Sequence, residues 1–157
     1  MRSADRRPTV ENARAIVDAS RYLVLATADA ERRPWSTPVY FAHVACREFL
    51  WVSSPEAVHS RNIAVRPEVG IAVFDSSVEI GTGQGVYVSA VAAELVDGAE
   101  RALEVFSRRS LGHGGRVWTL DDVRGDSGMR LYRAVAGTHS MLAKDGRPDH
   151  RVTVELG

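Results

Sequence analysis

Apolar residues change their spacing several times along the chain, and each change marks a predicted element. Val10, Ala13 and Ile16 recur at helical spacing, which predicts a first helix with one apolar face. Thr9 is a suitable N-cap for this helix. Residues 21–28 (RYLVLATA) then form a nearly continuous apolar run. Such a run predicts a strand that is buried on both faces.

Further strands are predicted from apolar runs and alternating patterns that turn residues separate. The remaining strand candidates are 35–44, 49–54, 68–76, 86–96, 129–143 and 151–156. Connections among the first five strands are short, which favours antiparallel neighbours over βαβ units. Pro38 lacks a backbone donor, so we expect the strand that contains it at a sheet edge or with a bulge. The expected fold class is mainly β with short helices.

Two further helices are predicted. The Ser-Pro-Glu sequence at 54–56 is typical of a helix start, with Ser as N-cap and Pro in the first turn, and this helix would run to about Val65. If it is an ordinary amphipathic helix, Val58, Ile63 and Val65 face the core and the polar positions face water. The segment 99–109 also has apolar residues at helical spacing.

Composition narrows the classes of function. The chain has 157 residues, 45% hydrophobic and 25% charged, which suits a single domain over residues 1–157. Lys+Arg and Asp+Glu are both 20, so no overall charge favours nucleic acid or an anionic membrane. No apolar run reaches the roughly 18 residues of a membrane span, and no signal peptide is visible, so we expect a cytoplasmic protein. Cys46 is the only cysteine, which excludes a disulfide within the chain.

Hydrogen-bond donors gather directly after the third predicted strand, within WVSSPEAVHSRNI (51–63). A helix N-terminus offers free backbone N–H groups, which suit an anion. The side chains that could add to this anion site are His59, Ser60, Arg61 and Asn62. Helical spacing prevents all four from converging on one anion from a single face. From these residues alone, an anion site and a solvated polar face remain equally open.

Other motifs are weaker. The loop Gly81-Thr82-Gly83-Gln84-Gly85 lets backbone approach a ligand closely, and the Gln84 amide could donate and accept, but the spacing is not that of a dinucleotide-binding loop. His113 and His139 are isolated in sequence, and no pattern with metal-ligand spacing occurs. No nucleophile motif of the Gly-x-Ser-x-Gly type is present.

The order of these segments resembles a known family. A helix is followed by YLVLATA, RPWSTPVYF, FLWVSS, HSRNI, RPEVGIAVFD and GQGVYVSAVAAEL, in this order over about residues 10–97. This order is similar to that of the FMN-binding split β-barrel family typified by pyridoxamine 5′-phosphate oxidase. Residues 98–157 fit the family more loosely, as a helix and two barrel strands. The resemblance implies an antiparallel split β-barrel that forms a homodimer with FMN at the interface.

The resemblance also implies a set of cofactor-binding residues. The strand with Trp35, Ser36, Thr37 and Val39 would lie along the flavin ring. Val52 and Ser53 would flank the ribityl region, and His59, Ser60, Arg61 and Asn62 would hold the phosphate. Gln84 matches a family glutamine at the flavin edge. No metal and no protein acid or base is expected.

Departures from the family pattern leave alternatives open. His59 stands where many relatives have Lys or Arg, and Ala57 where they often have Arg. The C-terminus, RVTVELG, lacks the run that holds pyridoxal phosphate in the true oxidases, so the expected function is an FMN-dependent oxidoreductase with another small-molecule substrate or electron donor. One alternative is a reductase that uses a deazaflavin of the F-420 type. Others are a non-catalytic flavin- or haem-binding protein, with His43, His113 or His139 as axial ligand, and a dimer that has lost its cofactor.

Overall fold

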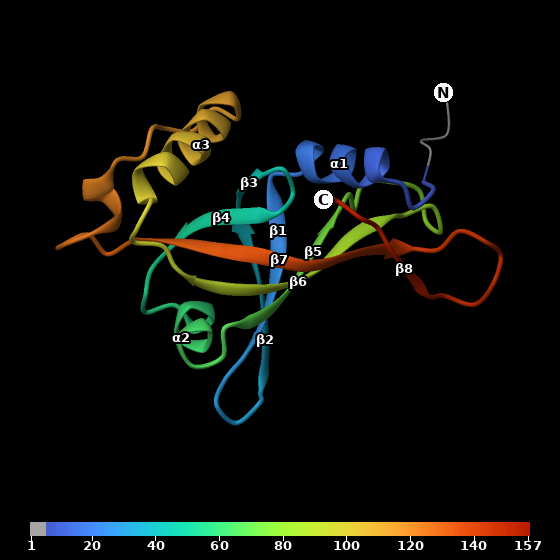
Figure 1. Ribbon diagram of the computed structural model, residues 1–157, viewed down its shortest axis with the longest axis horizontal. Coiled ribbons are helices and arrows are strands. Elements are labelled where there is room, and N and C mark those ends of the chain that lie inside the picture. Colours follow the sequence, from blue (N-terminus) through green and yellow to red (C-terminus); the bar gives the residue numbers. More distant parts are fainter. Residues whose placement is uncertain (1–5) are drawn as a thin grey trace.

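Eight antiparallel strands form one curled sheet in the computed structural model, which describes residues 6–157 (Figure 1). The strands are β1 (Tyr22–Ala28), β2 (Pro34–Tyr40), β3 (Ala42–Val44), β4 (Glu48–Ser53), β5 (Glu68–Phe74), β6 (Gly85–Glu94), β7 (Arg130–Leu142) and β8 (Arg151–Thr153). The helices are α1 (Val10–Ala19), α2 (Val58–Val65), α3 (Ala99–Gly112) and the short 3-10 helix η1 (Leu120–Val123). No helix in this part of the chain has both the length and the apolar character needed to cross a membrane.

The sheet curls into a half-barrel. The strand order is β2-β1-β5-β6-β7-β4-β3, with β8 added to β7. Phe41 alone separates β2 from β3, so the two ends of this order are joined by the chain, and β2 also contacts β4. The enclosed side holds the main core, in which Leu23, Phe41, Phe49 and Trp51 are fully buried. The expected split-barrel fold is therefore observed.

Pro38 lies on an edge strand, as its missing donor predicts. β2 pairs with β1 alone, so the other side of β2 carries backbone groups that no strand satisfies. The predicted single strand 35–44 is in fact divided, because the chain turns at Phe41 to pass from β2 to β3.

β1 corrects one prediction. The run 22–28 is buried on one face only: Leu23, Leu25 and Thr27 face the core, whereas Tyr22 and Ala26 are exposed. The outer face of the strand lines an open hollow with Gly70, Tyr87 and Arg151. An apolar sequence that would suit burial on both sides thus leaves one side bare within a single chain.

The second helix begins later than its sequence signal suggests. Ser54, Pro55 and Glu56 form a turn, in which the Ser54 side chain accepts from Glu56 N at 3.1 Å and the Ser54 carbonyl accepts from Ala57 N at 3.1 Å. Ala57, with extended backbone, is the N-cap of α2 and contributes no side-chain hydrogen bond. The Ser-Pro-Glu sequence therefore forms a turn that directly precedes the helix. Two other boundaries also differ: α3 extends to Gly112, and β8 is only three residues long.

α1 and α2 lie at opposite ends of the strands (Figure 1). α1 buries Ala13 and Val17 in the main core beside β5 and β6. α2 packs mainly on β1 and contacts β2 as well. α3 covers β3 and β4, where Phe106 joins Ala42 and Leu50 in a second cluster.

Candidate functional site

Three of the segments expected to bind a cofactor meet at the α2 end of the half-barrel. The free edge of β2, the last residues of β4 and the helix α2 contact one another. In β2, Trp35, Thr37 and Val39 pair with barrel-facing residues of β1, while Ser36 lies on the outer face. Val39 is buried, but Trp35 is 47% exposed because β2 extends beyond the core at this end. Trp35, Thr37 and Val39 therefore share one side of β2, and Ser36 lies on the other.

α2 has its polar residues inside and its apolar residues outside. His59, Ser60 and Asn62 are buried together with Ile63. Val58 and Val65 are 44% and 60% exposed. An ordinary amphipathic helix would show the reverse, so the alternative in which Val58 and Val65 face the core is wrong. Only the burial of Ile63 is confirmed.

Partners across the barrel end explain why these polar side chains are buried. Asn62 Nδ2 donates to Thr27 Oγ1 at 3.0 Å, and His59 Nε2 lies 2.9 Å from Ser53 Oγ. The Ser60 hydroxyl lies near the Tyr132 phenol but outside regular hydrogen-bond geometry. Buried polar groups need such partners, and α2 satisfies most of its own by closing the end of the barrel.

Arg61 is the member of the predicted clamp that faces solvent. Its side chain is 66% exposed, and its guanidinium forms an ion pair with Glu56 in the turn before the helix. The four donors therefore divide, three inward and one outward, as the helical spacing requires. Arg61 and the backbone N–H groups at the start of α2 are left as the groups that could meet an anion.

Burial lowers the pKa of His59 below its usual range. His59 is therefore a neutral imidazole at pH 7, and the positive charge at this site belongs to Arg61. In the unfolded chain His59 binds a proton near pH 6.5, whereas in the folded chain it does so only at lower pH. The contribution of neutral His59 to the free energy of unfolding is therefore fully present above pH 6.5 and is lost as the pH falls through the pKa of the folded state.

We expect the free energy of unfolding to fall between pH 7 and pH 5, and to fall less steeply in His59→Gln. Glutamine keeps a polar group near Ser53 but cannot titrate. Urea denaturation at several pH values measures both slopes. His43 and His113, whose pKa values burial also lowers, remain in the variant and account for a residual slope. Equal slopes in the two proteins would contradict the assignment to His59.

Val52 and Gln84 do not join the other candidates within one chain. Val52 points to the opposite side of β4, where it packs against the two clusters that contain Leu131 and Phe106. Gln84 precedes β6 and lies at the far end of β5 from α2, which at 3.3 Å per residue is roughly 20 Å away.

The Gln84 side chain already forms hydrogen bonds to the backbone of its own chain. Its Nε2 donates to the carbonyls of Arg6 and Leu142, both at 2.9 Å, and its Oε1 accepts from Gly85 N and Leu142 N, both at 2.9 Å. These bonds tie β6 to β7 and to the N-terminal segment. Its contact with a flavin edge stays a prediction, which would require a second chain.

A tyrosine–histidine pair was missed by sequence reasoning. Tyr40 Oη lies 2.7 Å from His113 Nδ1 in a hollow that Arg21 and Ser110 also line. The two residues are 73 positions apart, so no local pattern signals the pair. Burial, with the charges of Arg109 and Arg21, lowers the pKa of His113, which therefore offers a neutral Nε2.

The other histidines outside α2 are engaged in structural contacts. His43 Nε2 lies 2.7 Å from Asp18 Oδ1, and its Nδ1 accepts from Cys46 N at 3.0 Å. His139 Nε2 bonds the Cys46 carbonyl at 2.6 Å and is buried. Both hold the β3–β4 turn. Of the three histidines considered as axial ligands, His113 is the one with an accessible ring nitrogen that no described residue binds.

Comparison with known proteins identifies the family. The family model described as pyridoxamine 5′-phosphate oxidase matches residues 9–152. The search of curated proteins found no matching sequence.

Solved structures share the fold at low identity. A haem-binding protein from Mycobacterium smegmatis superposes with a TM-score of 0.70 and 21% identity over 92% of this chain, which spans 57% of that protein. HutZ, the haem storage protein of Vibrio cholerae, superposes with a TM-score of 0.65 and 22% identity. The match covers 82% of this chain and 91% of HutZ. An FAD-binding protein from Mesorhizobium loti superposes with a TM-score of 0.60 and 19% identity. The match covers 83% of this chain and 91% of that protein. These similarities establish the half-barrel fold and leave the ligand open.

Proposed function

Because the chain belongs to the pyridoxamine 5′-phosphate oxidase family, we propose that it is a flavin-dependent oxidoreductase that binds FMN beside β2 and α2. The observation that carries this proposal is the free edge of β2 next to the start of α2, with Arg61 exposed beside it. Unpaired backbone groups on β2 suit the polar edge of a flat ring. The helix start and Arg61 suit its phosphate.

In this proposal the bound flavin supplies the electron-transfer chemistry. The chain's own contribution is placement. The β2 backbone orients the ring, exposed Trp35 shields it from water, and Arg61 neutralises part of the phosphate charge. We assign no acid or base. A small molecule or an electron donor completes the reaction in the cytoplasm.

We also propose that the flavin site is shared by two chains. The outer face of the sheet carries small or apolar residues where β1 and β5 run side by side, and Arg151 lies over the Tyr87 ring of β6 at its margin. Val58 and Val65 on α2 are also apolar and exposed. A second copy that covered this face would bury it. It would also bring Gln84 of one chain toward the α2 end of the other, which a single chain cannot do.

FMN titration of Arg61 variants tests the site. Arg61→Ala should weaken FMN binding by about 1–2 kcal/mol, roughly 5- to 30-fold, because the pairing with phosphate is partly exposed to solvent. Glu56→Gln should strengthen it by roughly two- to fivefold, since the competing carboxylate is removed. Quenching of flavin fluorescence reports both dissociation constants.

Arg101→Ala, which removes an exposed arginine on α3, is the matched control and should leave FMN affinity unchanged. If Arg61→Ala binds FMN as well as the control does, the phosphate assignment is wrong. The absorption spectrum of the purified protein, with mass spectrometry of the released compound, separates FMN from a deazaflavin of the F-420 type. A longer acidic tail on the deazaflavin would need more basic residues than Arg61 supplies.

Haem binding is the second candidate, and His113 favours it. Its Nδ1 is oriented by Tyr40 and its Nε2 is accessible, which is the arrangement of a metal-ligating imidazole. Titration with haemin in place of FMN distinguishes the candidates. A Soret band that is retained in Arg61→Ala and lost in His113→Gln would favour haem over flavin.

A further inference from the structure

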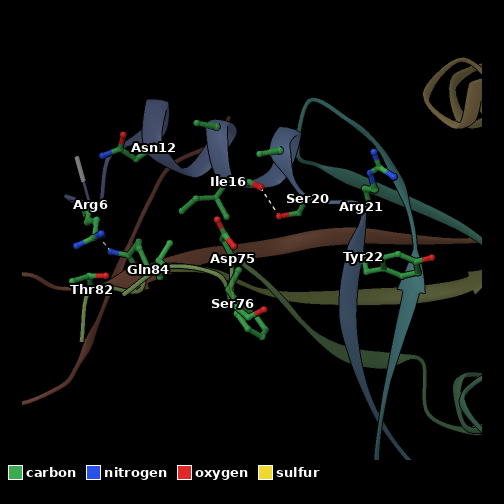
Figure 2. A pocket seen from close by; sticks show the side chains of 14 residues that line it. Arg6, Asn12, Ile16, Ser20, Arg21, Tyr22, Asp75, Ser76, Thr82 and Gln84 are labelled. Atoms are coloured by element: carbon green, nitrogen blue, oxygen red, sulfur yellow. Dashed lines mark hydrogen bonds between the residues drawn. The ribbon is translucent and has the colours of Figure 1, made fainter. Parts of the chain in front are cut away.

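A hollow of about 620 Å³ lies at the α1 end of the half-barrel, at the opposite end of the strands from α2 of the same chain. It is bounded by α1, by the start of β1 and by the segment between β5 and β6 (Figure 2). Ile16 on α1, Tyr22 on β1 and Phe74 on β5 give it apolar walls. Both aromatic side chains are at least half exposed. Its volume lies within the roughly 300–1,000 Å³ that is common for small-molecule sites.

Positive charge lies at the two ends of this hollow. Arg6 is at one end, beside Gln84 and Thr82, and Arg21 is at the other (Figure 2). Arg6 uses its backbone carbonyl to hold Gln84, while its guanidinium makes no hydrogen bond or ion pair to the described residues. Within residues 6–157, nothing competes with a ligand for the Arg6 guanidinium.

Negative charge lies between these ends. Asp75 is close to Ile16 in the middle of the hollow (Figure 2). Its Oδ1 accepts from Ser77 N at 2.8 Å and from Ser77 Oγ at 2.6 Å, and these bonds lower the pKa of the carboxyl. Within residues 6–157, its Oδ2 has no hydrogen-bond partner and no basic side chain pairs with it. Ser77 thus fixes an ionised carboxylate against an apolar wall.

We propose that this hollow is a second small-molecule site, which binds an elongated amphipathic compound carrying an anionic group and a protonated amine. The anion meets Arg6, the amine meets Asp75, and the apolar body lies along Ile16, Tyr22 and Phe74. A ligand with negative charge alone would be repelled by Asp75, and one with positive charge alone by the arginines. The lining of this site comes from one chain, although Gln84 at its edge is also the residue that the two-chain flavin proposal brings toward the partner's flavin.

Three probes with one apolar body test the charge pattern: ω-aminooctanoate, octanoate and octylamine. Their binding to the full chain is followed by NMR chemical-shift changes. We expect ω-aminooctanoate to bind at least roughly threefold more tightly than either of the others. Asp75→Asn keeps the acceptor for Ser77. In this variant ω-aminooctanoate should bind no more tightly than octanoate. In Arg6→Gln, ω-aminooctanoate should bind no more tightly than octylamine.

Blocking the hollow provides the independent test. Ala19 is exposed on the α1 wall, so Ala19→Trp fills the space without entering the core and should weaken ω-aminooctanoate binding roughly tenfold. Ala30→Trp, in the β1–β2 turn, is the control for added bulk and should bind normally. Equal affinity of the three probes, or undisturbed binding in Ala19→Trp, would overturn the proposal.

Discussion

Replacing Arg109 with alanine is expected to lower the free energy of unfolding by about 2–4 kcal/mol. Arg109 Nη2 donates to the carbonyls of Val17, Asp18 and Ser20, at 3.1, 3.2 and 2.7 Å. These groups lie at the C-terminal end of α1, where carbonyls lack helical partners and a cation is favourable. The guanidinium also lies over the Phe41 ring, 5.1 Å from its centre. One arginine of α3 therefore fastens the end of α1 to the body of the protein.

Arg108 provides the matched control, because it is the neighbouring residue on α3 and is exposed. Arg108→Ala should change the free energy of unfolding by less than about 0.5 kcal/mol. Arg109→Lys should fall between the two, since a single ammonium group replaces the planar fork. Urea denaturation of the three variants gives the comparison. If Arg108→Ala and Arg109→Ala are equally stable, the carbonyl contacts contribute nothing measurable.

The second large effect concerns the bare sheet face. Ala26 is exposed at its centre and pairs with Ser36 on β2 and Gly70 on β5. If a second copy covers this face, Ala26→Glu places a buried carboxylate in each half of the interface, beside a hollow that Arg151 also lines. We expect dimer affinity to fall more than roughly 100-fold, so that a protein that sediments as a dimer at micromolar concentration becomes a monomer. FMN binding should weaken with it.

Ala30→Glu carries the same change of charge in the exposed turn between β1 and β2, and it should remain dimeric. Far-ultraviolet circular dichroism checks that both variants keep the sheet. A wild-type monomer that binds FMN, or an Ala26→Glu protein that remains a dimer, would refute the two-chain site.

Much of the fold follows from local patterns. The helix after Thr9, the edge position of Pro38 and the succession of antiparallel strands were all predicted, because periodicity and turn residues act over a few positions. The meeting of β2, the end of β4 and α2 was also expected, through the resemblance to the family. Boundaries were less accurate: Ser54 has the chemistry of an N-cap, yet it closes a turn three residues before α2 is capped.

The orientation of the site residues could not be predicted in the same way. Val58 and His59 are adjacent in sequence, and hydropathy favours burying the valine. The structure buries the histidine, because Ser53 lies within hydrogen-bond distance. Asn62 is buried for the same reason, with Thr27 as its partner 35 positions away. The Tyr40–His113 pair and the hollow beside α1 likewise depend on contacts between distant segments.

The sequence by itself determined the kind and order of the elements, the edge strand and the family, because these depend on short-range spacing and on motif order. The tertiary structure alone decided which side chains of α2 are buried, which face of β1 is bare and where unpaired charges gather. These features depend on residues that become neighbours only when the sheet curls, and the free energy of a buried polar group is set by those neighbours.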